Sequence, residues 1–162
     1  MMLEVASAEH GAVNEAGIAV DSHPWLLQQL CVSLELDICQ IKVAPETEAY
    51  LTTLDSLCRS SPIEGIGALG PGNEFLLLQE YRALADSFEA ALPESQYSTF
   101  FNANLTQDER HHEVLAMVAT GLIELGAPSE LYVESAIRAA EARIEFYDSF
   151  LVKLKADKTK SQ

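Results

Sequence analysis

The chain has 162 residues, 48% hydrophobic and 22% charged, a composition typical of one folded domain with a buried core and not of a disordered chain. Acidic residues outnumber basic ones by 25 to 10, and the resulting formal net charge of −15 disfavours nucleic acid and anionic membrane surfaces as partners. No apolar run approaches the roughly 18 residues of a membrane span, and we expect no signal peptide because the N-terminus lacks a basic start followed by an apolar stretch.

The first predicted elements are helices separated by short breaks. The first twenty residues contain a weak helical stretch rich in Ala and Glu. Ser22 is expected to cap a helix over 23–40, which has a proline in its first turn. Another helix is expected over 45–59, where a proline again stands at the start.

The second half of the chain continues the helical pattern. A long segment over 63–92 is interrupted by Gly-Pro-Gly at 70–72. The next helix is expected over 93–126, where Gly126 is suited to cap the C-terminus, and the last helix over 128–154. No internal repeat and no convincing alternating strand is found, so the sequence predicts an all-α fold of about six helices.

The last residues of the chain are rich in lysine, with Lys153, Lys155, Lys158 and Lys160 close together. Such a run is typical of a solvated, frayed end. We therefore predict a single helical domain over 1–152, followed by a flexible tail over 153–162.

The three cysteines, Cys31, Cys39 and Cys58, stand in apolar, helix-like contexts without a CxxC pair. An odd number of cysteines in such contexts is typical of buried, reduced thiols. Since disulfides are rare in the cytoplasm, the pattern favours a cytoplasmic protein whose cysteines belong to its core.

Polar residues fall on the apolar face of the helix expected over 93–126. At about 100° per residue, one stripe collects Phe101, Leu115, Val118 and Leu122 together with Asn104, Asp108 and His111. A buried carboxylate requires a compensating partner, because its desolvation costs several kcal/mol. A divalent metal ion is one such partner, since Asp-x-x-His spacing puts both side chains on one side of a helical turn. A hydrogen-bonded Asp108–His111 pair without metal is the alternative.

A second acid is expected to face inward where the segment after 70–72 begins. Glu74 lies on the same stripe as Leu77, Leu78, Tyr81, Ala85 and Phe88. The sequence therefore predicts that Glu74, Asp108 and His111 converge between two helices, where they could share one ion. The nearby glycines would let a substrate or another segment approach closely.

The residues around this site resemble motifs of the haem-oxygenase-like diiron oxidases. This family of iron-containing redox enzymes groups TenA-like and chlamydial death-domain-associating-protein-like helical proteins. Its pattern F-F-x-x-H-x-x-x-D-x-x-H is similar to the stretch over 100–111, in which Asp108 and His111 match and Asn104 replaces the first histidine. The segment Gly-Ala-Leu-Gly-Pro-Gly-Asn-Glu, which ends at Glu74, resembles the family's small-residue stretch before a ligand glutamate.

Two stretches nearer the N-terminus extend the resemblance. Residues 14–17 and 23–27 are similar to the family's N-x-x-E-x-G and H-P-x-L-L stretches. Family members usually carry a further Glu and His on an earlier helix, so the resemblance implies a haem-oxygenase-like bundle that is shortened at the N-terminus. Of six family ligands, it leaves Glu74, Asp108 and His111, while the amide of Asn104 binds iron poorly compared with imidazole.

The resemblance implies an iron-dependent oxidoreductase in which Fe²⁺, held by these three residues, activates dioxygen to oxidise a small organic substrate. An alternative is a degenerate, metal-free relative that acts as a binding or assembly protein. The absent first helix would leave an apolar groove, so a homodimer that covers it is expected.

Overall fold

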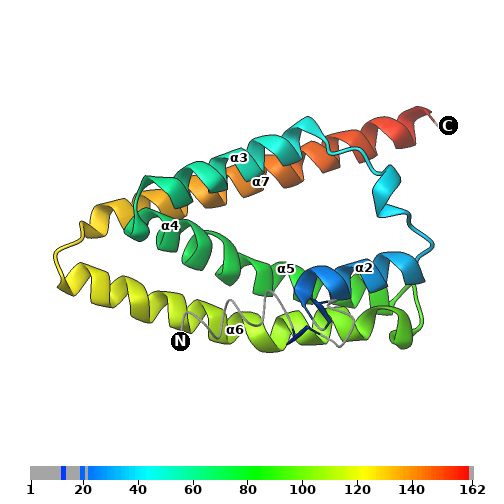
Figure 1. The fold of residues 1–162 in the computed structure, drawn as a ribbon. Coiled ribbons are helices and arrows are strands. Elements are labelled where there is room, and N and C mark those ends of the chain that lie inside the picture. Colours follow the sequence, from blue (N-terminus) through cyan, green and yellow to red (C-terminus); the bar gives the residue numbers. More distant parts are fainter. Residues whose placement is uncertain (1–11, 14–18, 21, 161–162) are drawn as a thin grey trace. The chain divides into compact units, whose positions relative to one another are not determined.

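The computed structural model describes residues 12–13, 19–20 and 22–160, without the side chains of 12–20, 94–96, 107–110 and 157–160. Within these residues helices dominate (Figure 1), which confirms the predicted all-α class. None of the described helices is long and apolar enough to cross a membrane. The chain divides into two compact units, one formed by residues up to Ile41 with 74–117, the other by 42–73 with the remaining C-terminal part.

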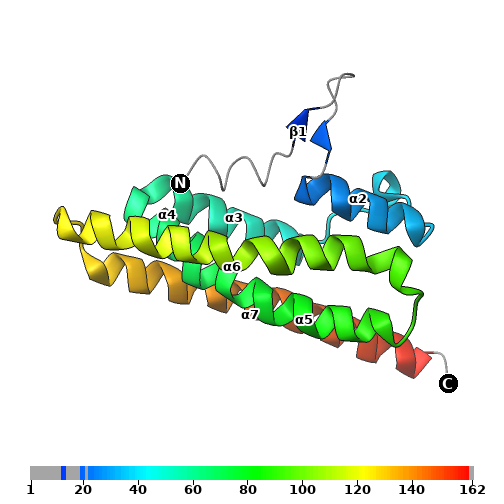
Figure 2. The ribbon, with the colours of Figure 1, turned by 90° about the horizontal axis from the view of Figure 1, so that it is seen from below.

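The first unit begins with two short strands, β1 (Ala12–Val13) and β2 (Ala19–Val20), drawn in dark blue before α2 in Figure 2. They pair antiparallel, with Ala12 opposite Val20 and Val13 opposite Ala19. The predicted helical stretch is therefore wrong at these four positions, where β-branched valines favour extended backbone. The rest of that stretch lies outside the described residues.

Helix α2 (His23–Ser33) starts where the sequence predicts, because Ser22 Oγ accepts the N–H of Trp25 at 3.2 Å. It ends at Ser33 and not near residue 40. Glu35 adopts a left-handed φ of 58°, which stops the helix. Asp37 then caps a separate 3₁₀ turn, Ile38–Gln40, by accepting the N–H of Cys39 at 3.0 Å.

Helices α5 (Phe75–Glu89) and α6 (Glu94–Glu124) complete the first unit, to which α6 contributes its residues through Met117. The core of this unit is mainly aromatic. Its buried members are Leu26, Leu30, Tyr97, Phe100 and Phe101, with Trp25, Tyr81 and Phe88 packed around them. Several ring pairs meet edge to face, an arrangement that adds to the stability gained from burial alone.

The second unit is built from α3 (Pro45–Ser60), α4 (Pro62–Leu69) and α7 (Ser129–Lys160). All three helices pack on one another, and α3 runs alongside α7 (Figure 1). The starts of α3 and α4 follow from their first-turn prolines. Gly126, with a φ of 99°, follows the last turn of α6, as predicted.

Small residues let α4 approach α7 closely. An ideal Cβ on Gly67 would lie 2.4 Å from the carbonyl oxygen of Tyr132, and one on Gly72 would lie 2.7 Å from the Cβ of Ala139. The chain then passes through a π-helical segment, Gly70–Glu74, into α5. The predicted interruption at 70–72 is therefore a widened helical turn.

Polar contacts connect the helices of the second unit. Buried Arg143 on α7 donates through Nη1 to Tyr50 Oη on α3 at 2.7 Å, and Tyr50 donates in turn to Asn73 Oδ1 at 2.7 Å.

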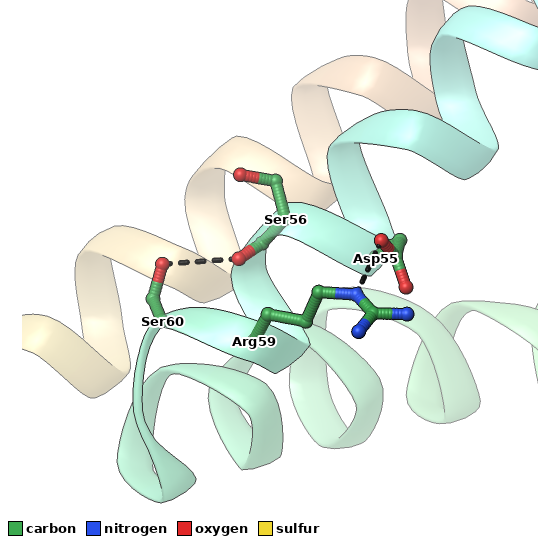
Figure 3. Close-up of polar contacts among 4 residues, drawn as sticks. All are labelled: Asp55, Ser56, Arg59 and Ser60. Atoms are coloured by element: carbon green, nitrogen blue, oxygen red, sulfur yellow. Dashed lines mark hydrogen bonds and ion pairs between the residues drawn. The ribbon is translucent and has the colours of Figure 1, made fainter.

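An ion pair lies on the exposed face of α3, near the end of that helix. Arg59 donates to the Asp55 carboxylate at 2.7 Å (Figure 3), and this bond holds the pKa of Asp55 below its ordinary value.

The structure differs from the sequence prediction at the C-terminal end. Helix α7 continues through Lys160, so the backbone of 153–160 is helical where a flexible tail is predicted. Lys153 Nζ donates to Glu46 Oε2 on α3 at 2.7 Å, and this hydrogen bond is the main cause of the lowered pKa of Glu46. The contact ties the end of α7 to the start of α3.

The prediction of buried cysteines is wrong. Cys39 and Cys58 are exposed and Cys31 is only partly buried. Cys39 lies in the 3₁₀ turn after α2, none of whose residues is buried. The apolar sequence context of these residues misleads because many apolar neighbours, such as Val32 and Ile41, are themselves exposed.

Candidate metal site

The central part of α6 carries the buried polar face that the sequence predicts. His111 is 4% exposed and Asn104 is 2% exposed. Phe101, one turn before Asn104, and Leu115, one turn after His111, are buried as well. An imidazole and an amide therefore stand inside an apolar environment, where polar groups need partners.

Glu74 approaches His111 from the junction between the π-helical segment and α5. The distance between Glu74 Oε2 and His111 Nδ1 is 3.9 Å, with 17% of the Glu74 side chain and 5% of the His111 side chain exposed. This distance exceeds that of a hydrogen bond. Two ligand atoms that each lie about 2.1 Å from one metal ion can be up to roughly 4.2 Å apart. The observed 3.9 Å is close to this limit, which corresponds to ligand atoms on nearly opposite sides of an ion, and it is also the distance of an ion pair when His111 is protonated.

Asp108, the third predicted ligand, belongs to α6, but its side chain lies outside the described residues. Its convergence with Glu74 and His111 stays a prediction. The helix is continuous from Asp108 to His111, so the i, i+3 relation on which the prediction depends is preserved.

Asn104 makes a hydrogen bond to its own helix. Its Nδ2 donates to the carbonyl oxygen of Phe100 at 2.7 Å. Such a bond fixes the amide in the core and satisfies its donor. The diiron-oxidase motif has a histidine ligand at this position, whereas Asn104 bonds to the backbone of its own helix.

His23 lies near His111, a neighbour that sequence reasoning missed. It is the first residue of α2 and is partly buried, and its ring centroid lies 6.0 Å from that of His111. The Ser22 cap fixes the helical turn from which it projects. No local spacing connects positions 23 and 111, and the one signal in the sequence is the H-P-x-L-L resemblance over 23–27, which assigns no ligand role to this histidine.

His112, the neighbour of His111, points elsewhere. Its ring packs on Phe75 with centroids 5.2 Å apart. Its buried Nδ1 has no hydrogen-bond partner among the described residues. His112 therefore provides a control for His111, since it has the same chemistry on the same helix with different neighbours.

Among the side chains that the structure describes, no three of the types His, Cys, Asp and Glu are close enough to share an ion as they stand. An ion bound by Glu74 and His111 would need a third ligand, for which Asp108 and His23 are the candidates. Two imidazoles on one ion have ring centroids up to roughly 6 Å apart. The 6.0 Å between the rings of His23 and His111 lies at this limit.

A cavity of about 230 Å³ lies between α2 and the start of α6. Trp25 and Leu26 line it from α2, and Thr99 and Phe100 line it from α6. Its volume is below the roughly 300–1,000 Å³ of sites for drug-sized ligands. A small organic molecule is the size of ligand that such a space could take.

Comparisons of the chain with protein-family models, curated proteins and solved structures find no match. Its function is therefore inferred from the residues that meet around His111.

Proposed function

We propose that this protein is an iron(II)-dependent oxidoreductase, related to the haem-oxygenase-like diiron oxidases, that uses dioxygen to oxidise a small organic substrate. The observation that carries the proposal is the approach of the Glu74 carboxylate to the His111 imidazole at 3.9 Å in a largely buried place. Asp108 is the expected third ligand, and His23 is a second imidazole within reach.

The donor set supports a ferrous ion. A carboxylate oxygen and imidazole nitrogens are the ligands of non-haem iron sites that activate oxygen. A direct charge-assisted bond between Glu74 and His111 would close to about 2.8 Å. The wider spacing leaves room for an ion that neutralises the acid and binds the ring.

Each side chain around the proposed ion has a separate role. A bound ferrous ion would supply dioxygen activation. Glu74 provides negative charge that retains the cation, and His111 provides a neutral nitrogen ligand. The His111 side chain is itself only 5% exposed, so little water reaches the ring. Trp25, in the wall of the cavity between α2 and α6, would position an apolar substrate.

Asn104 supports one ion and not two. Its amide nitrogen is engaged with the carbonyl of Phe100, and an amide binds iron more weakly than the histidine it replaces. With that ligand lost, a second iron lacks a nitrogen donor on α6. The proposed centre is therefore mononuclear.

The proposal is tested by titrating the purified chain with ferrous iron under anaerobic conditions and measuring the bound metal. We expect the unmutated chain to bind one ion and His111→Ala to bind none. Glu74→Gln keeps the shape of the side chain but removes its charge, so its affinity for iron should be strongly reduced. His112→Ala is the matched control and should bind iron like the unmutated chain. Circular dichroism must show that all variants stay folded.

Absence of bound iron in the unmutated chain would overturn the proposal and leave the metal-free binding or assembly protein as the better explanation. Equal losses in His111→Ala and His112→Ala would also contradict it, because the two rings have different neighbours. If iron binds, oxygen uptake in the presence of candidate small substrates measures the activity.

A further inference from the structure

A second cavity of the first unit, of about 360 Å³, lies between the end of α5 and the start of α6. We call it the α5–α6 cavity. All of its lining residues belong to the first unit, and none of them is a residue of the candidate metal site. Its volume is within the roughly 300–1,000 Å³ of sites that hold small molecules. The cavity is therefore large enough for a ligand of its own.

Aromatic side chains form one wall of the α5–α6 cavity. Tyr97 and Phe101, one turn apart on α6, both line it and are 8% and 3% exposed. Phe88 on α5 packs against them, with its ring centroid 6.1 Å from that of Tyr97 and 5.3 Å from that of Phe101. Because these rings are held on several sides, the wall is fixed before any ligand arrives.

Helix α5 contributes two carboxylates to the same cavity. Asp86 and Glu89 line it three residues apart, a spacing that puts both on one side of the helix. Both are exposed, and among the described residues neither side chain forms an ion pair or a hydrogen bond. Arg82, one turn before Asp86, is exposed as well and does not pair with it in the described structure. The two carboxylates are therefore available to a ligand.

The charge of the first unit favours a cation in this cavity. Residues 1–41 and 74–117 contain fourteen acidic residues and two basic ones, Arg82 and Arg110. None of the described residues that line the cavity is basic. A hollow in such a negative surface raises the local concentration of cations. We therefore expect a positively charged occupant.

The aromatic wall favours an organic cation over a metal ion. Ammonium groups are attracted to the faces of Tyr and Phe rings, whereas hard metal ions need several oxygen ligands. No three described His, Cys, Asp or Glu side chains are close enough to share an ion. Ser98 and Asn102, one turn apart on α6, also line the cavity and offer oxygens that accept N–H bonds. Such acceptors favour a primary ammonium group over a quaternary one.

We propose that the α5–α6 cavity binds a small aliphatic diamine with both amino groups protonated. Asp86 and Glu89 balance the two positive charges. The rings of Tyr97 and Phe101 contact the methylene chain, and the neutral oxygens of α6 accept hydrogen bonds from an ammonium group. The proposal does not depend on iron, because the cavity shares no residue with the candidate metal site.

The test is a calorimetric titration of the full chain with 1,4-diaminobutane, at constant ionic strength and without added metal. We expect saturable binding of one diamine per chain. Butylamine, which has one charge, should bind more weakly, and the neutral 1,4-butanediol should not bind. Glu89→Gln should lower the affinity for the diamine about fivefold, as expected for the loss of one exposed ion pair.

Glu113→Gln is the matched control for Glu89→Gln. It removes the same charge from an exposed position of the first unit that does not line the cavity. Glu113 lies about 16 Å along α6 from Asn102, and salt screens an exposed charge over that distance. The affinity of this variant should therefore stay within about twofold of the unmutated chain. Circular dichroism checks that both variants are folded.

Several results would overturn the proposal. Without saturable binding of the diamine there is no site, and equal losses in Glu89→Gln and Glu113→Gln would show a diffuse counterion. Equal affinities for butylamine and the diamine would exclude recognition of two charges. Ca²⁺ that bound more tightly than the diamine and was lost in Glu89→Gln would indicate a metal site instead. In a ¹⁵N-labelled chain, the diamine should shift the amide signals of residues 86–89 and 97–102, and shifts confined to other segments would contradict the location.

Discussion

Replacing Gly67 by alanine tests the close packing of α4 on α7. The added Cβ would lie 2.2 Å from Ser135 Oγ, 2.4 Å from the carbonyl oxygen of Tyr132 and 3.1 Å from its carbonyl carbon. The hydroxyl can rotate away, but the carbonyl belongs to the backbone of α7. An ordinary carbon–oxygen contact is about 3.3 Å, so the two helices would have to separate by roughly 1 Å.

The net effect of Gly67→Ala combines two opposed terms. Overpacking of a filled interior costs about 1–3 kcal/mol, and the backbone contact places this position at or above the upper end. Alanine gains about 1 kcal/mol over glycine inside a helix. We expect a net loss of about 2 kcal/mol in the free energy of unfolding, which lowers Tm by about 6 °C in a chain of this size.

Gly121→Ala is the matched control. Gly121 lies inside α6, and a Cβ there meets no atom within 4 Å. Its substitution should raise stability by about 0.5–1 kcal/mol through helix propensity alone. Both variants are measured by thermal and urea unfolding followed by circular dichroism. If Gly67→Ala is as stable as Gly121→Ala, the close approach of α4 to α7 is refuted.

Two further substitutions probe the second unit. Tyr50→Phe removes the hydroxyl that accepts from Arg143 Nη1, which keeps its second acceptor, Asn73 Oδ1. Because Arg143 is 6% exposed, we expect the free energy of unfolding in urea to fall by about 1 kcal/mol; an unchanged midpoint would contradict the buried contact. Lys153→Met should raise the pKa of Glu46 toward its ordinary value in an NMR titration, because the lysine is the main cause of the lowered pKa. Since that pKa is lowered in the folded state, the stabilisation is present above the ordinary pKa and is lost as pH falls through the lowered one. The small Tm difference from the unmutated chain should therefore disappear in acid, and a difference independent of pH would argue against the ion pair.

Local chemistry made much of the fold predictable. The starts of α2 and α3 and the end of α6 depend on Ser22, on Pro45 and on Gly126, each of which acts within one turn of its own position. The apolar stripe of α6 likewise follows from helical periodicity alone. The burial of His111 could be predicted for that reason.

Contacts between distant segments were not predictable. His23 meets His111 only because α2 packs near α6, and no spacing in the sequence encodes that approach. The early end of α2 depends on Glu35, whose left-handed backbone is unusual for a residue that otherwise suits a helix. The helical end of α7 depends in part on a bond from Lys153 to α3, far away in the sequence.

X-ray absorption at the iron edge of the anaerobically loaded chain tests the central claim most directly. A single ion bound by Glu74 and His111 predicts nitrogen and oxygen ligands at about 2.0–2.2 Å, an imidazole scattering signal that decreases in His111→Ala but not in His112→Ala, and no iron–iron distance. A spectrum of hydrated iron alone, or one unchanged by His111→Ala, would contradict the proposed site.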